Sequence, residues 1–282
     1  GDRIGRKKTL MVTLLVMGIS TACIGLLPTY AQVGVWAPIL LVALRIIQGL
    51  ATGGEWGGAS LLTLEHTKTR RAFWGSFISM AVFIGLILGN LVFLSLDALL
   101  TDAQLFGWGW RIAFLLSLLM VGVGVYMRRR IDETPEFAEV KAKNERSRTP
   151  LLEALKKHPR NIIAIFLMRV GQNTSFYIIS VFCLAYAATL GMERWVTLTA
   201  LLLGATAAAI ACPFWGILAD RIGYSKIMIG SLVVSALLAF PIFAFLESKS
   251  AVFIILVIVV AIAGVNAASD AIQPGYFTSM FG

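Results

Sequence analysis

Polar side chains recur at helical spacing within the long apolar segments of this chain. One set lies in residues 36–62 at positions i, i+3, i+7 and i+10: Arg45, Gln48, Thr52 and Glu55. On a helix they share one stripe about 80° wide. An arginine binds a carboxylate through paired hydrogen bonds, and a glutamate can gain and lose a proton. We expect Arg45 and Gln48 to contact an anionic substrate, and Glu55 to couple a proton together with Arg45.

A second polar face lies in residues 161–188 and consists of Arg169, Gln172, Asn173, Phe176, Tyr177 and Ser180. Aromatic rings can pack a substrate, while amides and a phenol hydroxyl bind its polar groups. We therefore expect four of them to bind substrate: Arg169, Gln172, Asn173 and Tyr177. The alternative for Arg169 is that its long side chain reaches the membrane interface.

Other interpretations of these faces stay open. Glu55 can instead pair with a basic residue of a helix outside this chain and hold the bundle together. Gly49, Gly53 and Gly57 recur at fourfold spacing, which favours close approach of a neighbouring helix. A third polar face holds Asn266, Ser269, Asp270 and Gln273, where a gating or helix-end role for Asp270 is an alternative to substrate contact.

The composition requires a membrane protein. Of the 282 residues, 58% are hydrophobic and 14% are charged, and the mean hydropathy is +0.84. A soluble domain carries roughly 25% charged residues. Apolar blocks of this length predict eight spans, at 10–29, 36–62, 73–96, 110–127, 161–188, 196–217, 227–246 and 251–272.

The basic residues predict which side each loop faces. Of the 24 Lys and Arg residues, 19 lie in four alternate segments, at 1–9, 63–72, 128–160 and 218–226. By the positive-inside rule these segments and both chain ends are cytoplasmic. The net charge of +9 therefore follows from topology and does not indicate nucleic-acid binding.

A short motif is repeated at equivalent points of the predicted topology. Asp2-Arg3-Ile4-Gly5 returns as Asp220-Arg221-Ile222-Gly223, each time in a cytoplasmic loop before a span. Two similar halves joined by a charged linker are typical of parallel-repeat transporters, whose substrate site lies between the halves. We predict an N-terminal bundle portion at 1–127, a cytoplasmic linker at 128–160 and a C-terminal bundle portion at 161–282.

Several motifs resemble those of a known family. GDRIGRKK at residues 1–8 resembles the signature loop of the major facilitator superfamily, and Arg45-Ile46-Ile47-Gln48-Gly49 resembles its fourth-helix motif. GGEWGGA, WGWRIAFLLS and DETPEF are similar to motifs of its metabolite:proton symporters, which carry shikimate, 2-oxoglutarate, citrate and proline or betaine. WAPILLVALRIIQG leans toward the shikimate carriers among them.

The resemblance implies an all-α membrane protein of the major facilitator fold, with two pseudo-symmetric helical bundles. The chain aligns with helices three to ten of twelve, so we expect a truncated chain of about eight transmembrane helices. The resemblance also implies gating roles for Asp2, Arg3, Gly5 and Arg6. For the second copy we expect Asp220 and Arg221 to act in a weaker latch, with Asp270 as a further gating candidate.

The function expected is proton-coupled symport of a small organic acid or zwitterionic metabolite, by a monomer in the inner (plasma) membrane. The alternatives are a facilitative or sugar transporter of the same superfamily and a fragment that does not transport. We expect no enzyme activity, because no nucleophile elbow or phosphate-binding loop is present. We expect no cofactor and no metal, since the two His and three Cys are not clustered.

Overall fold

The computed structural model describes residues 6–67, 69–129, 155–248 and 250–280, with only the backbone of Arg6 and Arg194. These residues form helices and connecting turns and contain no strand. The first helices are α1 (Arg6–Gly25), α2 (Tyr30–Val33), α3 (Trp36–Glu65), α4 (Arg71–Leu99), α5 (Asp102–Gln104), the π-helix η1 (Leu105–Gly109), α6 (Trp110–Leu115) and α7 (Ser117–Arg129).

The later helices are α10 (Pro159–Tyr177), η2 (Ile178–Phe182), α11 (Cys183–Thr189), α12 (Arg194–Ile222), α13 (Tyr224–Glu247), α14 (Ala251–Val259), η3 (Val260–Asn266) and α15 (Ala267–Ser279). Two short π-helical segments, η2 and η3, therefore interrupt spans that the sequence predicts as regular helices, and a third, η1, precedes the predicted span at 110–127. Segments of this kind frequently lie near functional sites.

The eight predicted spans are confirmed in number and order. Eight described helical stretches are long and apolar enough to cross a membrane, from Lys7–Gly25 to Ala251–Ser279. The ends differ from prediction by several residues. The first helix ends at Gly25 and not at residue 29, because Pro28 lacks a backbone donor and disfavours helix before it. The last stretch continues seven residues past the predicted end at 272, to Ser279.

The contacts between helices divide the chain into two compact units. One contains residues 1–65 and 95–150, and the other contains 66–94 and 151–282. Most of α4 therefore packs with the later helices, although the repeat places it in the portion 1–127. The predicted division at 127 and 160 stays a prediction about the two bundles of the whole protein.

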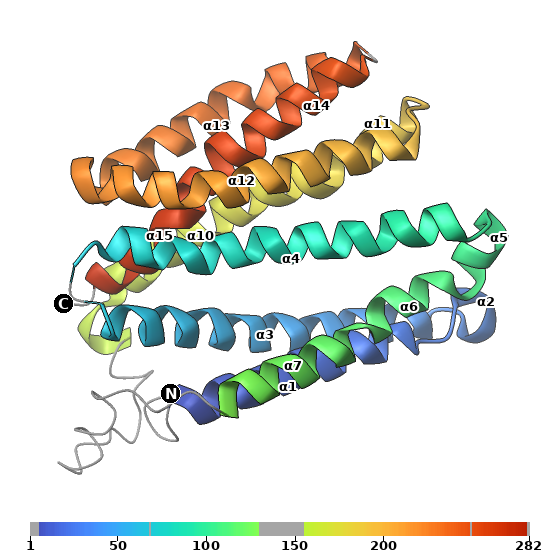
Figure 1. Ribbon diagram of the computed structural model, residues 1–282, viewed down its shortest axis with the longest axis horizontal. Helices are drawn as coiled ribbons and strands as arrows, with labels where there is room; N and C mark the ends of the chain where they lie inside the picture. Colours follow the sequence, from blue (N-terminus) through green and yellow to red (C-terminus); the bar gives the residue numbers. More distant parts are fainter. Residues whose placement is uncertain (1–5, 68, 130–154, 249, 281–282) are drawn as a thin grey trace. The chain divides into compact units, whose positions relative to one another are not determined.

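In the first unit, α3 and α7 pack against α1 (Figure 1). Small residues allow the close approach of α3: a Cβ atom at Gly54 would lie 2.9 Å from Thr13, and one at Gly58 would lie 2.8 Å from Leu10. Gly49, Gly53 and Gly57 have nothing within 4 Å of such a Cβ atom. The expected close packing is thus made by the two glycines offset by one position, and not by the fourfold series.

In the second unit, α12 is the central helix and packs against α14, η3 and α15 (Figure 1). Its small residues Ala200, Ala205, Ala208 and Cys212 are buried, together with large side chains such as Phe83 of α4 and Ile258 of α14. Small residues on a central helix let several neighbours approach it at once. This packing holds α10 and α15, which carry the polar cluster around Arg169.

At Gly216, α12 lies very close to the backbone of α4. A Cβ atom there would lie 2.8 Å from the carbonyl oxygen of Ala72 and 2.9 Å from Cα of Phe73. Both are backbone atoms, so a side chain could be accommodated only if the two helices moved apart.

We predict that Gly216→Ala lowers the thermal unfolding temperature of the detergent-solubilised protein, because overpacking costs about 1–3 kcal/mol. Gly230→Ala on α13 is the matched control, since no atom lies within 4 Å of the added Cβ. We expect that control to leave the unfolding temperature unchanged or slightly raised. Equal unfolding temperatures for the two variants would contradict the prediction.

Candidate functional site

Arg169 is the centre of a polar cluster inside the second unit. One nitrogen of its guanidinium lies 3.3 Å from a carboxylate oxygen of Asp270 and 3.2 Å from the amide oxygen of Gln172. The same nitrogen donates to the amide oxygen of Gln273. The side chain of Asp270 is 14% exposed and that of Arg169 is 35% exposed. A charge pair in a span satisfies each partner's need for an opposite charge.

Two buried amides complete this cluster. Gln273 is 0% exposed and Asn266 is 1% exposed. The amide nitrogen of each has no hydrogen-bond acceptor among the described residues. Residues 266, 270 and 273 share one face of the η3–α15 helix, so both amides lie on the side that carries Asp270. A buried donor left without an acceptor costs about 1–3 kcal/mol, so a ligand oxygen bound there gains that amount.

The predicted face of α10 is split in the structure. Gln172 is buried beside Arg169, and Ser180 is buried farther along the same helix. Asn173 and Tyr177 are exposed and line a depression with Val170, Thr174, Ile178 and Phe182. Of the four residues predicted to bind substrate on α10, the cluster therefore contains Arg169 and Gln172, and the other two lie on the exposed side of the stripe.

The polar stripe of α3 faces a matching stripe on α1. The amide nitrogen of Gln48 donates to the hydroxyl of Thr21 at 2.6 Å, and the hydroxyl of Thr52 lies 3.5 Å from the sulfur of Met17. Residues 13, 17 and 21 recur at fourfold spacing on α1, so they form one face that follows the stripe of α3. Over most of its length, the polar stripe of α3 therefore finds polar or sulfur-containing partners on α1.

Arg45 ends this stripe. It is exposed, and its guanidinium donates to the amide oxygen of Gln48 at 3.4 Å. The predicted pair of Arg45 and Gln48 therefore lies together, whereas Glu55 contacts different residues about three turns farther along α3.

Glu55 is paired within this chain. Its carboxylate accepts from the hydroxyl of Thr13 at 2.8 Å and forms an ion pair with Arg128 of α7. Arg128 also donates to the backbone carbonyl of Leu10. The sequence left open a basic partner for Glu55 on a helix outside this chain. In the structure that partner is Arg128 of α7, within the chain, and the resulting contacts join α1, α3 and α7.

The second copy of the repeated motif caps a helix. The two carboxylate oxygens of Asp220 accept from the backbone N–H groups of Ala72 and Phe73, each at 3.0 Å. These groups belong to the first turn of α4, where a negative charge is favoured by unpaired N–H groups and the helix dipole. Gly223 follows with a φ of +97°, as expected for the tight turn of this motif. Arg221 is exposed beside it.

The first copy of the motif falls outside the part of the chain that the structure describes. This holds for Asp2, Arg3 and Gly5, and for the side chain of Arg6. In the described parts of the chain no group of three or more His, Cys, Asp or Glu side chains is placed to hold a metal ion.

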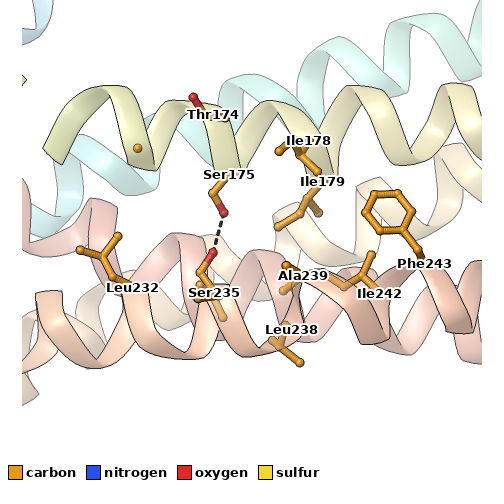
Figure 2. Close-up of a pocket in the computed structure, with 14 residues that line it drawn as sticks. Thr174, Ser175, Ile178, Ile179, Leu232, Ser235, Leu238, Ala239, Ile242 and Phe243 are labelled. Carbon is orange, nitrogen blue, oxygen red and sulfur yellow. Dashed lines mark hydrogen bonds between the residues drawn. The ribbon is translucent and has the colours of Figure 1, made fainter. Parts of the chain in front are cut away.

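A separate cavity of about 330 Å³ lies between α10 and α13 (Figure 2). Its lining is mainly apolar, and a 2.9 Å hydrogen bond between the hydroxyls of Ser175 and Ser235 crosses it. None of the residues predicted to bind substrate lines this cavity. The candidate site is therefore the polar cluster and not the apolar cavity.

Sequence reasoning misses two relations that the structure reveals. The predicted cytoplasmic linker begins at Arg128, although this side chain turns back to Glu55. The sequence predicts a gating role for Asp270 and a substrate-binding role for Arg169. In the structure these two residues, 101 positions apart, contact one another. The fourfold spacing of Thr13, Met17 and Thr21 is a signal that could have predicted the partner of the α3 stripe.

Comparison with known proteins gives one family. A family model described as Major Facilitator Superfamily matches residues 1–281. The shikimate transporter of Escherichia coli (strain K12) is 38% identical over 289 residues, which cover 100% of this chain and 65% of that protein. An inner membrane metabolite transport protein of the same strain is 40% identical over 252 residues, covering 87% of this chain and 57% of the relative.

The same fold is found among solved structures. The proton:xylose symporter bound to 6-bromo-6-deoxy-D-glucose matches with a TM-score of 0.69 and 17% identity, over 97% of this chain and 66% of that one. The chain spans about three fifths of the length of the two Escherichia coli relatives. These relatives are transport proteins and not enzymes.

We predict that Arg128→Met destabilises the protein by about 1–3 kcal/mol, because it leaves the largely buried carboxylate of Glu55 without its cation. The measurement is thermal unfolding in detergent. The double variant Glu55→Gln/Arg128→Met should lose less stability than the sum of the two single variants, as expected for directly interacting residues.

Arg129→Met is the matched control for this ion pair, because the neighbouring Arg129 side chain is exposed. We expect it to leave the unfolding temperature unchanged. Strict additivity in the double variant would show that Glu55 and Arg128 do not stabilise one another.

Proposed function

The chain belongs to the major facilitator superfamily, and on that premise we propose that it is part of a secondary active transporter. The transporter carries a small organic acid or zwitterionic metabolite, shikimate-like or a dicarboxylate, together with protons by alternating access. The protein lies in the bacterial inner membrane with both ends of this chain in the cytoplasm, as the distribution of Lys and Arg indicates.

The observation that carries this proposal is the intramembrane cluster around Arg169. A guanidinium inside a span is costly, so its presence there supports a role for its charge. Arg169 is accompanied by the buried amides of Gln172 and Gln273, which can bind the oxygen atoms of a polar solute. An arginine with nearby amide donors suits a carboxylate.

Arg45 supports the same class of substrate in the first unit. It is exposed, is hydrogen-bonded only weakly to Gln48 at 3.4 Å, and lies within the 30-residue helix α3, away from both of its ends. Asn173 and Tyr177 line an exposed depression on α10 and remain proposed substrate contacts. A similar relative transports shikimate, which supports a small carboxylate as substrate.

Alternating access also requires a gate, for which we propose Asp220. It bonds the first turn of α4 to the end of α12 through two backbone N–H groups. Gly216 lies one turn earlier and keeps the same two helices in close contact. Breaking these bonds would let α4 separate from α12. The repeated motif implies a corresponding gate in the other half, formed by Asp2, Arg3, Gly5 and Arg6. In the gate at Asp220, we assign a supporting role to Arg221.

Uptake into vesicles tests the proposed function. We expect the complete gene product that contains these 282 residues to accumulate radiolabelled shikimate when the outside is made acidic. Arg45→Ala should abolish this uptake and the stabilisation of the purified protein by shikimate. Lys157→Ala, which removes an exposed charge outside the spans, is the control and should behave as the parent protein does.

Two outcomes would contradict the proposal. Uptake that equilibrates shikimate but is unaffected by collapse of the pH gradient would favour a facilitative carrier. A complete gene product that neither binds nor transports shikimate, 2-oxoglutarate, citrate or betaine would rule out the proposed substrate class.

We predict that Asp220→Ala opens the gate between α4 and α12. A cysteine placed at the buried Ser76 position, in a protein without its native cysteines, should react faster with a membrane-impermeant maleimide added from the cytoplasmic side. Loss of the two hydrogen bonds, worth ~1 kcal/mol together at this exposed position, predicts an increase of about fivefold.

Asp97→Ala, at the other end of α4, is the matched control for the gate. Its labelling rate should equal that of the parent. An unchanged rate in Asp220→Ala would remove Asp220 from the gate.

A further inference from the structure

Basic side chains gather at one end of the second unit, where α4 begins, α12 ends and α13 begins (Figure 1). This basic cluster consists of Arg70, Arg71, Arg221 and Lys226, all of them exposed. We propose that the basic cluster, together with Trp74 and Phe77 of α4, binds an anionic phospholipid. The inference goes beyond the proposed function, because it concerns the lipid that surrounds the protein and not the solute that it carries.

Hydrogen bonds hold the start of α4 against the end of α12. The carboxylate of Asp220 accepts from the backbone N–H groups of Ala72 and Phe73, each at 3.0 Å. Arg71 directly precedes Ala72, and Arg221 directly follows Asp220, so the backbones of the two arginines lie close together. Each of the two helices therefore contributes an arginine at the same place.

The start of α13 joins this place through Tyr224. Gly223 turns the chain from α12 into α13, with a φ of +97°. Arg71 and Asp220 both lie close enough to Tyr224 to act on its hydroxyl electrostatically. Lys226 follows in the first turn of α13. The basic cluster thus combines side chains from the ends of three helices.

The basic cluster has few negative charges to balance it. Within the described parts of the chain, none of its four side chains forms an ion pair with an acidic residue. Asp220 lies beside them, but both of its carboxylate oxygens accept from backbone N–H groups. Arg128 and Arg169, by contrast, each have a carboxylate partner. Because like charges repel at short range, the basic cluster favours the binding of an anion.

Arg70 also has an uncommon backbone conformation. Its φ is +52°, in the left-handed region that residues other than glycine seldom occupy. Among the described residues, no other residue except glycine has a positive φ. Conformations of this kind carry a small energetic cost and are concentrated at functional sites. The conformation is consistent with a binding role for this arginine.

The side chains along α4 follow the order of the parts of a phospholipid. Trp74 is 45% exposed and Phe77 is 39% exposed, and both lie within two turns of Arg71. Phe73 packs edge-on against both rings, with centroids 5.3 and 5.2 Å away. Exposed aliphatic residues continue the same helical stripe at positions 81, 84 and 88. Positive charge is thus followed by aromatic rings and then by aliphatic side chains.

This order favours a lipid over a free anion as the ligand. Tryptophan is enriched at the depth where lipid headgroups meet acyl chains, and its indole N–H can donate to an ester or phosphate oxygen. A free phosphate would contact the basic residues and leave the aromatic rings exposed. The distribution of Lys and Arg places this end of the spans at the cytoplasmic leaflet. Basic residues just outside a span attract anionic headgroups there.

A bound headgroup would join the same helix ends that Asp220 joins. A phosphate that accepts from both Arg71 and Arg221 contacts α4 and α12 at once. Binding to the folded protein alone raises its stability by mass action. We therefore expect phosphatidylglycerol to raise the unfolding temperature of the detergent-solubilised protein more than phosphatidylcholine does.

Quenching of Trp74 by brominated lipid tests the proposal directly. The complete gene product is reconstituted in phosphatidylcholine bilayers that contain a small fraction of phosphatidylglycerol with brominated acyl chains. Bromine quenches tryptophan fluorescence at short range, so quenching reports lipid beside an indole. We expect a component of the quenching to saturate at a lower fraction of brominated phosphatidylglycerol than of brominated phosphatidylcholine. Trp74→Phe should remove that component.

Substitutions of the arginines test the charge of the site. Arg70→Gln/Arg71→Gln should weaken the phosphatidylglycerol component roughly 25-fold, because each basic residue near an anionic surface contributes about fivefold. Arg70→Lys/Arg71→Lys keeps both charges and should retain most of the affinity. Arg129→Gln/Lys157→Gln is the matched control, since it removes two exposed basic residues next to other spans. That control should quench as the parent does.

A second double variant guards against a failure to fold. Should Arg70→Gln/Arg71→Gln not fold, Arg221→Gln/Lys226→Gln removes the other half of the basic cluster and should show the same loss. Equal quenching by the two brominated lipids would overturn the proposal, as would a component that neither double variant diminishes. A loss of equal size in Arg129→Gln/Lys157→Gln would show general attraction of lipid to basic residues and not this site.

Inorganic phosphate distinguishes the source of the anion. We expect an excess of inorganic phosphate, compared with sodium chloride of the same ionic strength, to leave the phosphatidylglycerol component unchanged. Specific displacement by phosphate would show a site for a free anion and overturn the assignment to lipid. Uptake of shikimate is measured separately, so the lipid site and the proposed transport can each fail while the other stands.

Discussion

The cost of an unpaired charge in an apolar helix bundle governs the structure of this chain. Lipid offers no counter-charge, so each ionised side chain within a span needs an opposite charge, a set of hydrogen bonds or access to water. In the described residues, two clusters meet this need, one in each compact unit. Glu55 meets Arg128 in the first, and Asp270 meets Arg169 in the second.

The two clusters satisfy this constraint in different ways. Around Glu55 the contacts are numerous and involve backbone as well as side chains of α1, α3 and α7. Around Asp270 the contact with Arg169 is longer, and neighbouring amides share the guanidinium. A cluster with many contacts resists rearrangement, whereas a shared guanidinium can change partners at lower cost. The cluster at Glu55 thus suits a role in stability, and the cluster at Asp270 suits a role in the transport proposed above.

Close helix packing is the condition that makes both clusters possible. Gly54 and Gly58 bring α3 close enough to α1 for Glu55 and Gln48 to reach threonine hydroxyls. In the second unit, the small residues of α12 allow α14, η3 and α15 to pack around it, so that α15 presents Asp270 toward α10. Asp220 at the end of α12 fixes the first turn of α4 by the same principle, with backbone N–H groups in place of a cation.

The sequence by itself determined the class of protein, the eight helices and the helix faces that carry polar residues. Composition, length of apolar runs and helical periodicity are local properties, and they suffice for these features. Family membership followed from motifs that lie along the chain, such as Arg45-Ile46-Ile47-Gln48-Gly49. The turn at Gly223 was also predictable, because only glycine readily adopts its positive φ.

Only the tertiary structure decided which polar residues meet. Periodicity places a residue on a face of its own helix and contains no information about the helix opposite. Arg169 and Asp270 are 101 positions apart, and Glu55 and Arg128 are 73 apart, so packing brings each pair together. The same reason explains why Asn173 and Tyr177 separate from Gln172: their helix is partly covered by neighbours, and that cover decides which side of a polar stripe is buried.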